Sequence, residues 1–409
     1  MTREQRHGWL IVAVLFVVEM LVLGGITGTM GLFLTPLMKQ FGWSHSRVSM
    51  LPTAFSLAFG LGTPLVGSLM DRIDARFIMS WGAAMGGLGL LIASQTPSFE
   101  IFFAAFLAIG LGTCASTFVP AAIVVANWFT DNRGFATGAA MMGSSVGTIL
   151  MPLLAAHLLS ARGVSFTYEV LSTLALLNII PLFAIVRTRP GDTRSSVSET
   201  AQSLPGLEVG QALKTSSFWL LALIQTLLLG GEAGVFFHLG SFLAGAGFSP
   251  QQTAMVYSGT AVAGIFGMML IGALADRFTA RRVLPFVILP LAASVIVLLG
   301  SHGTNPILWV CGYVILYGLA GGVAVSLTPV VLVEALGLRR FGSLSGLVGL
   351  VATAGTGGPL LVGALYDATS SYTVSYEVCA AAFLLSAFAA IFIVPMEGVE
   401  TARVSTHGA

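Results

Sequence analysis

Two acidic residues, Glu19 and Glu232, have the clearest potential for chemistry in this sequence. Each interrupts a long apolar stretch, 8–36 for the first and 217–243 for the second. A helical rise of 1.5 Å per residue places both carboxyl groups roughly 16 to 22 Å from the start of their stretches. An ionisable group at that depth in a bilayer costs at least ~2.5 kcal/mol, so it normally faces a polar cavity and has a function. Both residues are therefore candidates for binding a proton or a substrate.

Two interpretations of these carboxyl groups remain open. A carboxyl group held away from water can bind and release a proton, which makes proton coupling the functional hypothesis. The alternative is a glutamate that stays protonated, donates a hydrogen bond to a backbone carbonyl and supports packing. Next to Glu232, the residues Gly230, Gly231 and Gly234 favour a cavity or a hinge.

The elements that must position these glutamates are membrane helices. The chain is 56% hydrophobic and 9% charged, with a mean hydropathy of +0.92. Lipid cannot satisfy backbone N–H and C=O groups, so apolar stretches of this length must be helices. We predict an all-α integral membrane protein with twelve transmembrane helices, at 8–36, 46–69, 77–95, 99–126, 134–159, 167–187, 217–243, 252–275, 283–301, 305–334, 341–366 and 374–394.

The charged residues predict an orientation and exclude several classes of function. With a cytoplasmic N-terminus, nearly all Lys and Arg residues fall on the cytoplasmic side, as membrane topology requires. The chain is therefore predicted to be a multi-pass protein of the cytoplasmic (inner) membrane with both termini inside.

The net charge of +1 argues against a nucleic-acid partner. The sequence shows no phosphate-binding loop, metal-ligand spacing or nucleophile arrangement, so we expect no enzyme activity, no cofactor and no metal.

A polar segment divides the chain into two halves that repeat each other. We predict an N-terminal six-helix bundle at 1–187, a cytoplasmic linker at 188–216, and a C-terminal six-helix bundle with a short cytoplasmic tail at 217–409. The sequence Gly-Ser-Leu-Met-Asp-Arg that ends at Arg72 recurs as Gly-Ala-Leu-Ala-Asp-Arg ending at Arg277. Both copies follow the second helix of their half, which predicts two pseudo-symmetric bundles.

With these two motifs the chain resembles the major facilitator superfamily, whose signature after the second helix is Gly-x-x-x-Asp-Arg followed by further basic residues. Within that superfamily it is similar to the monocarboxylate porters and the oxalate/formate exchangers. The similarity rests on Gly8-Trp9, on Trp128-Phe129-x-x-x-Arg133-Gly134 with Gly143 and Gly147, and on Phe341-Gly342 leading to Gly358-Pro359, Gly363 and Asp367.

The resemblance implies alternating access, in which two bundles rock about a solute site near the bilayer midplane. It also implies a gate of cytoplasmic charge contacts and helix caps made by Asp71, Arg72, Arg76, Asp276, Arg277 and Arg281. The alternative is that these residues only determine topology.

The sequence departs from the monocarboxylate porters where they hold proton and carboxylate. Those porters carry a lysine late in the first helix and an Asp/Arg pair in the eighth, and the corresponding residues here are Gly28, Gly264 and Met268. Every Lys and Arg can be placed outside the apolar helices. Either backbone dipoles and hydroxyl groups hold the carboxylate, or the substrate is not a small anion.

Further polar and aromatic residues on the central helices are candidates for lining a substrate cavity. Hydroxyl groups bonded to their own helix, or aromatic rings packed between helices, are the alternative for each. An outer histidine can act as a pH gate or simply form a hydrogen bond at the interface. The candidates are Thr27, Thr29, Ser116, Thr117, Tyr313, Tyr317 and His238.

The sequence thus predicts a secondary active transporter for a small organic solute, with a monocarboxylate-like acid and proton coupling as the first hypothesis. The alternative is efflux of a cationic or lipophilic compound in exchange for protons at Glu19 and Glu232. The expected partners are the solute, the proton and the lipid bilayer, with no obligatory protein partner.

Overall fold

The computed structural model of the chain is helical throughout the residues that it describes, which are 3–70, 72–129, 133–187, 206–302, 305–337 and 339–395. Ten helices in these ranges are long and apolar enough to cross a membrane. One of them, Phe135–Ile185, contains two of the predicted spans, joined at Gly163 with a φ of 81°. Two shorter apolar helices, Pro306–Ala320 and Leu327–Leu336, correspond to the tenth predicted span. The prediction of an all-α membrane architecture with twelve spans is confirmed.

Contacts between helices divide the chain into two compact units. Unit 1 comprises Met1–Gly191 and Phe236–Ala261, and unit 2 comprises Asp192–Val235 and Val262–Ala409. The segment Phe236–Ala261 therefore groups with the N-terminal helices, although it belongs to the second half of the sequence. The predicted boundaries 1–187, 188–216 and 217–409 stay predictions, and most of the predicted linker, residues 188–205, lies outside the described residues.

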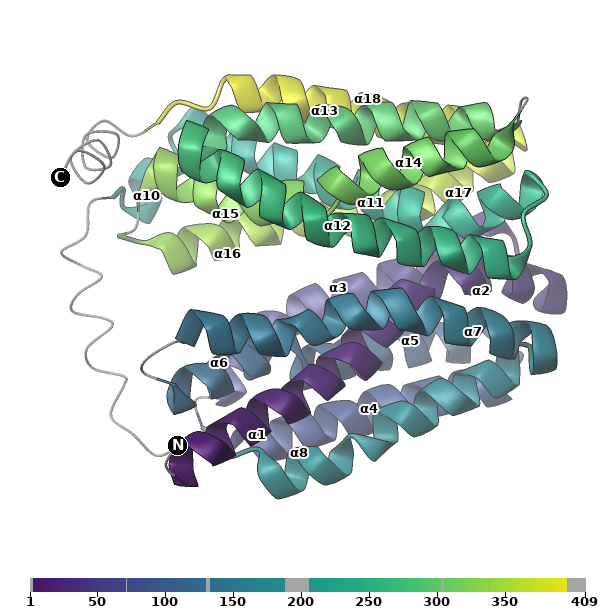
Figure 1. Ribbon diagram of the computed structural model, residues 1–409, viewed down its shortest axis with the longest axis horizontal. Coiled ribbons are helices and arrows are strands. Elements are labelled where there is room, and N and C mark those ends of the chain that lie inside the picture. The colour runs from purple at the N-terminus through teal and green to yellow at the C-terminus, as the bar shows by residue number, and fades with distance from the viewer. Residues whose placement is uncertain are drawn as a thin grey trace. The chain divides into compact units, whose positions relative to one another are not determined.

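Unit 1 begins with one long helix and continues with a bundle around it (Figure 1). α1 (Arg3–Val18), the π-helical segment η1 (Glu19–Gly24) and α2 (Gly25–Phe41) follow one another without a break. The rest of the unit's N-terminal part is α3 (His45–Met70), α4 (Ala75–Gln95), α5 (Phe99–Ser116), α6 (Phe118–Trp128), α7 (Arg133–Leu177) and α8 (Ile179–Ile185).

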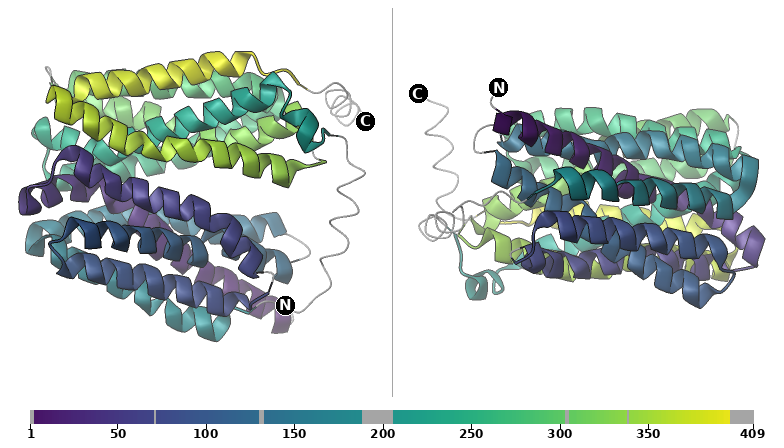
Figure 2. Two further views of the ribbon diagram at one scale, coloured as in Figure 1. Left: turned by 180° about the vertical axis from the view of Figure 1, so that it is seen from behind. Right: turned by 90° about the horizontal axis from the view of Figure 1, so that it is seen from below.

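Unit 2 contains most of the second half of the sequence, and its helices also run side by side (Figure 2). Two of its helices extend into unit 1, namely α11 (Ser216–Gly245) and α12 (Pro250–Phe278). The remaining elements are α10 (Val209–Ala212), α13 (Ala280–Leu299), η2 (Gly300–His302), α14 (Pro306–Ala320), α15 (Val323–Leu336), α16 (Phe341–Ala352), η3 (Thr353–Gly357), α17 (Gly358–Thr369) and α18 (Tyr372–Ile391).

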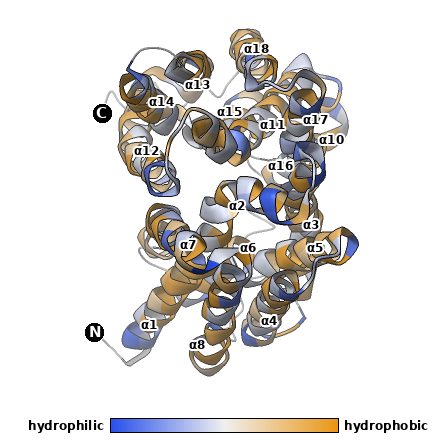
Figure 3. Cartoon of the chain, turned by 90° about the vertical axis from the view of Figure 1, so that its right-hand side faces the viewer, coloured by the Kyte–Doolittle hydropathy of each residue, from blue (hydrophilic) through white to orange (hydrophobic). Residues whose placement is uncertain are grey.

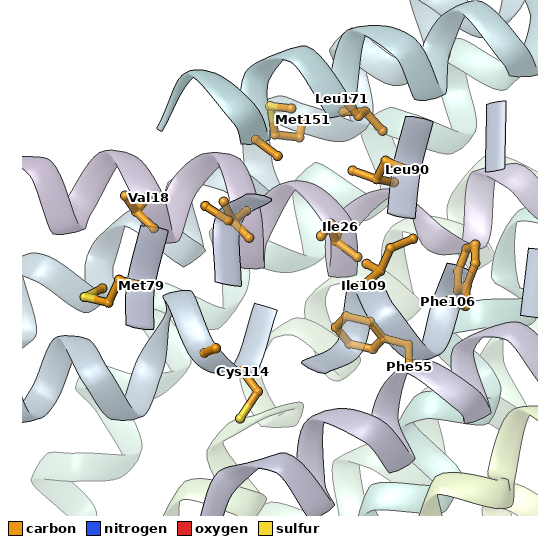
Figure 4. Close-up of a cluster of buried hydrophobic side chains, with 14 of the residues drawn as sticks. Val18, Ile26, Phe55, Met79, Leu90, Phe106, Ile109, Cys114, Met151 and Leu171 are labelled. Atoms are coloured by element: carbon orange, nitrogen blue, oxygen red, sulfur yellow. The ribbon is translucent and has the colours of Figure 1, made fainter. Parts of the chain in front are cut away.

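Apolar side chains cover the outward surfaces of the helices, as lipid contact requires. Phe135, Met269 and Phe286 are each more than 70% exposed. Along the helices the hydrophobic colour predominates, and hydrophilic residues collect at helix ends and turns (Figure 3). The inner faces of unit 1 form an apolar cluster, in which Val18 lies beside Met79 and Ile26 beside Ile109 (Figure 4).

Glycine pairs bring the helices of unit 1 close together. A Cβ atom at Gly112 would meet the backbone of Gly82 and Gly86, so α4 and α5 touch backbone to backbone. Gly147 of α7 lies against the carbonyl oxygen of Met20 and the Cα of Gly24 in the same way. Small residues at such contacts drive helix association in membranes, where no hydrophobic force acts between helices. α7 is thereby held against the segment that begins at Glu19.

A substitution at this contact tests the packing. We expect Gly147→Ala to lower the melting temperature of the purified protein by several degrees, because overpacking a tight contact costs about 1–3 kcal/mol. Gly138→Ala on the same helix is the matched control, since no atom lies within 4 Å of a Cβ there. A thermal-unfolding scan in detergent makes the measurement, and equal melting temperatures for the two variants would contradict the packing described.

Candidate functional site

Glu19 lies at the first residue of the π-helical segment of the first span. Its side chain has no exposed surface, and neither carboxyl oxygen makes a hydrogen bond. The backbone N–H of Phe118, the first residue of α6, lies toward this carboxyl. π-helical turns inside α-helices are frequent at functional sites. The structure thus places Glu19 in the interior of unit 1, facing the start of another helix.

Close helix packing makes this position possible. A Cβ at Gly143 of α7 would collide with the carbonyl oxygen of Phe16, and one at Gly24 with that of Ser144. These contacts flank Glu19 on both sides along the chain. The glycines that carry part of the family resemblance therefore let α7 seal Glu19 from the surroundings of unit 1.

A break in the fourth span faces Glu19. α5 ends at Ser116, Thr117 is extended with φ −122° and ψ −155°, and α6 begins at Phe118. The hydroxyl of Thr117 donates to the carbonyl of Thr113 at 2.7 Å, and it does not cap α6. The N-terminus of a helix carries free N–H groups and a partial positive charge. The break therefore presents a favourable environment for a carboxylate to Glu19.

Glu232 has the equivalent arrangement in unit 2. Its Oε2 accepts a hydrogen bond from the N–H of Gly322 at 3.2 Å, and its Oε1 is buried without a hydrogen bond. Gly322 lies between α14 and α15 with a φ of 71°, which only glycine adopts without strain. The same sequence offset separates Thr117 from Gly322 and Asp71 from Asp276. The two breaks are therefore equivalent positions of the two sequence repeats.

The glycines around Glu232 serve close packing. A Cβ at Gly230 would lie 3.1 Å from the carbonyl oxygen of Gly355, and one at Gly234 2.9 Å from the side chain of Val362. A cavity of about 350 Å³ lies on this face of α11, lined mainly by apolar groups of α17, η3 and α18. Glu232 is not among its lining residues. The glycines thus accompany both a close helix contact and a cavity, and a cavity or hinge at Glu232 itself stays a prediction.

Two tyrosines of α14 lie next to Glu232. The Tyr317 hydroxyl donates to the backbone carbonyl of Glu232 at 3.2 Å, and its ring stacks on Tyr313 with centroids 5.0 Å apart. Both tyrosines are buried. On α11, Gln225 lies two turns before Glu232, and its Oε1 is buried without a hydrogen bond. Sequence analysis missed Gln225, although its spacing of seven residues from Glu232 indicates a shared helix face.

The predicted cavity hydroxyls of unit 1 bond to their own helices. The hydroxyl groups of Thr27, Thr29 and Ser116 donate to carbonyls one turn earlier, at 2.7, 2.7 and 2.8 Å. Thr29 also lines a narrow apolar cavity of about 20 Å³ with Ile26, Phe33 and others. A substrate role for these residues, and for Thr117, stays a prediction.

His238 lies among hydrogen bonds that connect the segment Phe236–Ala261 to the rest of unit 1. Its Nε2 is 3.0 Å from the hydroxyl of Ser49. Nearby, Thr35 bonds to Ser241 at 2.7 Å, and the hydroxyl of Ser258 donates to the carbonyl of Ile149 at 2.5 Å. His238 is fully buried, so it is part of this connection and not a surface group.

The predicted gate residues lie at the arginine-rich ends of the helices. In unit 1, Arg76 stacks over Phe77 at 4.7 Å, and the carboxyl of Asp74 caps α4 by accepting from the N–H of Arg76 at 3.1 Å. Arg72 follows α3 and is exposed, and Asp71 lies outside the described residues. The gating role of all these residues stays a prediction.

In unit 2 the corresponding cap comes from Glu334, which sequence analysis missed. Its two oxygens accept from the N–H groups of Ala280 and Arg281 at 3.1 and 3.0 Å, at the start of α13. The Arg281 guanidinium also donates to the carbonyl of Ile393. Arg277 stacks over Phe278, and Asp276 precedes it on α12. An acidic residue at the end of the tenth span, near two arginines, was the signal available in the sequence.

Comparison with known proteins gives consistent results. The family model described as Major Facilitator Superfamily matches residues 15–357. The uncharacterised MFS-type transporter YcxA of Bacillus subtilis is 24% identical over the full length of both chains. Monocarboxylate transporter 13 of Rattus norvegicus is 26% identical over 95% of this chain and 89% of its own length. The solved structure of the nucleoside transporter NupG superposes with a TM-score of 0.78 at 14% identity, covering 95% of this chain and 99% of that chain.

The glycine at the second break allows a direct test. We expect Gly322→Ala to lower the melting temperature by a few degrees, because a left-handed backbone costs a non-glycine residue about 1–2 kcal/mol. Gly346→Ala is the control, since it has the same change in mass, open space around its Cβ and no positive φ. Differential scanning fluorimetry in detergent compares the two. An unchanged melting temperature for Gly322→Ala would show that the break does not depend on glycine.

Proposed function

The chain belongs to the Major Facilitator Superfamily, and on this basis we propose that it carries a small monocarboxylate-like organic acid across the cytoplasmic membrane together with a proton. Transport follows alternating access, in which the solute site opens first to one side and then to the other. Glu19 and Glu232 bind the proton. The arginine-rich helix ends face the cytoplasm, in agreement with the positive-inside rule.

One observation carries the proposal: each unit directs a carboxyl group from its first span at a break in its fourth span. Glu19 meets the start of α6, and Glu232 meets the start of α15. A structural glutamate would have its oxygens satisfied by ordinary hydrogen bonds, yet three of these four oxygens have none. Groups with such unmet bonding capacity are suited to binding and releasing a proton.

The substrate class rests on relatives. Several transporters named as monocarboxylate transporters match most of the chain at about 25% identity.

The cytoplasmic gate in this proposal is formed by Asp71, Arg72, Arg76, Asp276, Arg277 and Arg281. The helix caps made by Asp74 and Glu334 hold in place the helix starts that carry Arg76 and Arg281. Loss of these caps would loosen the gate.

Export of a cationic compound in exchange for protons is the second candidate. It is favoured by the two buried carboxyl groups and by the position of each Lys and Arg in the described residues at or beyond a helix end or helix join. In that mechanism the cation and the proton compete for Glu19 and Glu232.

A proton-flux assay separates the two candidates. Purified protein in liposomes with a trapped pH dye is exposed in turn to lactate, pyruvate, longer carboxylates and organic cations. We expect protein-dependent acidification of the lumen with a carboxylate, because the acid and a proton enter together. Protein-free liposomes measure the leak of the undissociated acid. Proton movement with cations alone would establish the second candidate and reject the first.

A substitution at Glu232 tests its proton-binding role. We expect Glu232→Gln to abolish uptake driven by a pH gradient and to leave exchange of labelled against unlabelled substrate largely intact, since exchange needs no net proton release. Glu377→Gln, an exposed glutamate of α18, is the control and should transport normally. If Glu232→Gln retains both fluxes unchanged, Glu232 is a structural residue.

A further inference from the structure

Building on the proposed function, we propose that the backbone N–H groups of Phe118 and Gly322 each bind a substrate carboxylate within their own unit. In the empty transporter, Glu232 accepts a hydrogen bond from the N–H group of Gly322, and Glu19 lies opposite that of Phe118. A substrate carboxylate takes the place of a glutamate only when that glutamate has bound a proton. The glutamates are thus built-in competitors of the substrate, and the competition couples proton to solute.

The need for such groups follows from the distribution of charge. In the described residues, each Lys and Arg lies at or beyond a helix end, or at Arg162 beside the helix join at Gly163. The helix interiors therefore offer a carboxylate no permanent cation. Helix N-termini are the other common anion-binding groups of proteins, because their N–H groups are free and their dipole is positive.

The break at α6 has the features of a carboxylate site. α6 has eleven residues, and its N-cap residue Thr117 makes no side-chain cap. Glu19 faces the N–H of Phe118 from a fully buried position, with both oxygens free of hydrogen bonds. A carboxyl group that is completely enclosed and yet does not close a hydrogen bond is poorly held in its place. It can therefore yield the N–H group to another carboxylate.

The break at α15 repeats this arrangement with the hydrogen bond formed. Gly322 is the N-cap of α15 without a side-chain cap, and its N–H donates to Oε2 of Glu232 at 3.2 Å. Because Thr117 and Gly322 are equivalent in the two sequence repeats, each unit contributes one such group. The hydrogen bond at Gly322 shows directly that a carboxylate oxygen fits at the break.

Proton coupling follows from electrostatics. Two carboxylates cannot share one N–H group in a low-dielectric interior, because their repulsion there is far stronger than in water. Once the glutamate is protonated, it is neutral and the N–H group is available to the substrate anion. One proton and one carboxylate thus enter each site together, and both leave when the glutamate returns to the amide.

Few other titratable groups face these glutamates. The elements that pack against η1 are α1, α2, α5 and α7, together with the start of α6. The buried titratable side chains on these elements are Cys114 of α5, whose Sγ is 3.6 Å from the hydroxyl of Thr63, and Tyr168 of α7. Around Glu232 the titratable groups are Tyr313, Tyr317 and, beside Gly231, Cys379. Unperturbed thiols and phenols titrate near pH 8.5 and 10, roughly, so they stay neutral during an assay near pH 6.

Removal of a single N–H group tests the proposal at its central point. Phe118 is the first residue of α6, where proline is tolerated, and the extended Thr117 before it suits a following proline. Phe118→Pro therefore removes the N–H group with little change in backbone. Phe118→Ala is the matched reference, because it removes the same ring and keeps the N–H group.

We expect the KM for carboxylate exchange at about pH 5.5 to be roughly tenfold or more higher in Phe118→Pro than in Phe118→Ala, as expected for losing a hydrogen bond to a charged group. Equal KM values in the two variants would overturn the proposal. Size-exclusion chromatography of both variants establishes that they are folded before the comparison.

A second measurement does not depend on the proline variant. In the wild type, the apparent affinity for the carboxylate substrate in exchange should fall as the pH rises from about 5.5 to 7.5. The reason is that the ionised glutamates then compete with the substrate for the backbone N–H groups. The double variant Glu19→Gln, Glu232→Gln has neutral competitors at both sites, and its affinity should not change with pH. A double variant that keeps the wild-type pH dependence would overturn the proposal.

These outcomes separate the inference from the function on which it rests. Absence of carboxylate flux in the wild type rejects the proposed function, and the inference with it. Carboxylate flux with a proton, but with equal KM in the two Phe118 variants and an unchanged pH profile in the double variant, rejects only the inference.

Discussion

The structure depends on one constraint: a backbone amide inside a membrane must have a partner, and a helix supplies that partner everywhere except where it breaks. Unit 1 breaks its fourth span at Thr117, and unit 2 breaks the equivalent span at Gly322. A carboxyl group from the first span of the same unit is placed at each break. The features that look unusual in isolation, namely a buried glutamate, a π-helical turn and a left-handed glycine, are parts of the same arrangement.

Close packing between helices lowers the energetic cost of placing a carboxyl group in each helix bundle. Because Gly143 and Gly147 bring α7 against the backbone of the first span, Glu19 is enclosed by protein and not by lipid. In unit 2, Gly230 and Gly358 bring α11 against α17 in the same manner. A carboxyl group facing lipid would be expelled toward the interface or destabilise the helix that carries it. Backbone contact between helices keeps each glutamate carboxyl group next to the backbone N–H group at the helix break.

Sequence analysis predicted the parts of this arrangement that depend on composition. Hydropathy located the twelve spans, and the rarity of acidic residues in apolar stretches identified Glu19 and Glu232 without any structural information. The breaks were not predicted, because Thr117 and the Gly321-Gly322 pair are ordinary residues in apolar sequence, and only long-range packing decides whether the helix continues through them. The hydroxyls of Thr27 and Ser116 look alike in sequence whether they face a cavity or their own carbonyls, and the local backbone decides between the two. Glu334 was missed because its role is to cap a helix distant in sequence.

The helix interiors of the described residues hold no Lys or Arg, and this has a consequence for how an anion transporter can work. An arginine in the interior holds an anion at all times, so a separate device is then required to release it. An amide at a helix break holds an anion weakly and only while no nearby carboxylate claims the same N–H group. Glu232 accepts a hydrogen bond from the N–H group of Gly322 through one oxygen, and its other oxygen has no hydrogen bond. This is the state expected of a carboxyl group that stays near the N–H group and can still release it. In such a design, release of the substrate and release of the proton are the same event, because the returning glutamate displaces the carboxylate as it loses its proton.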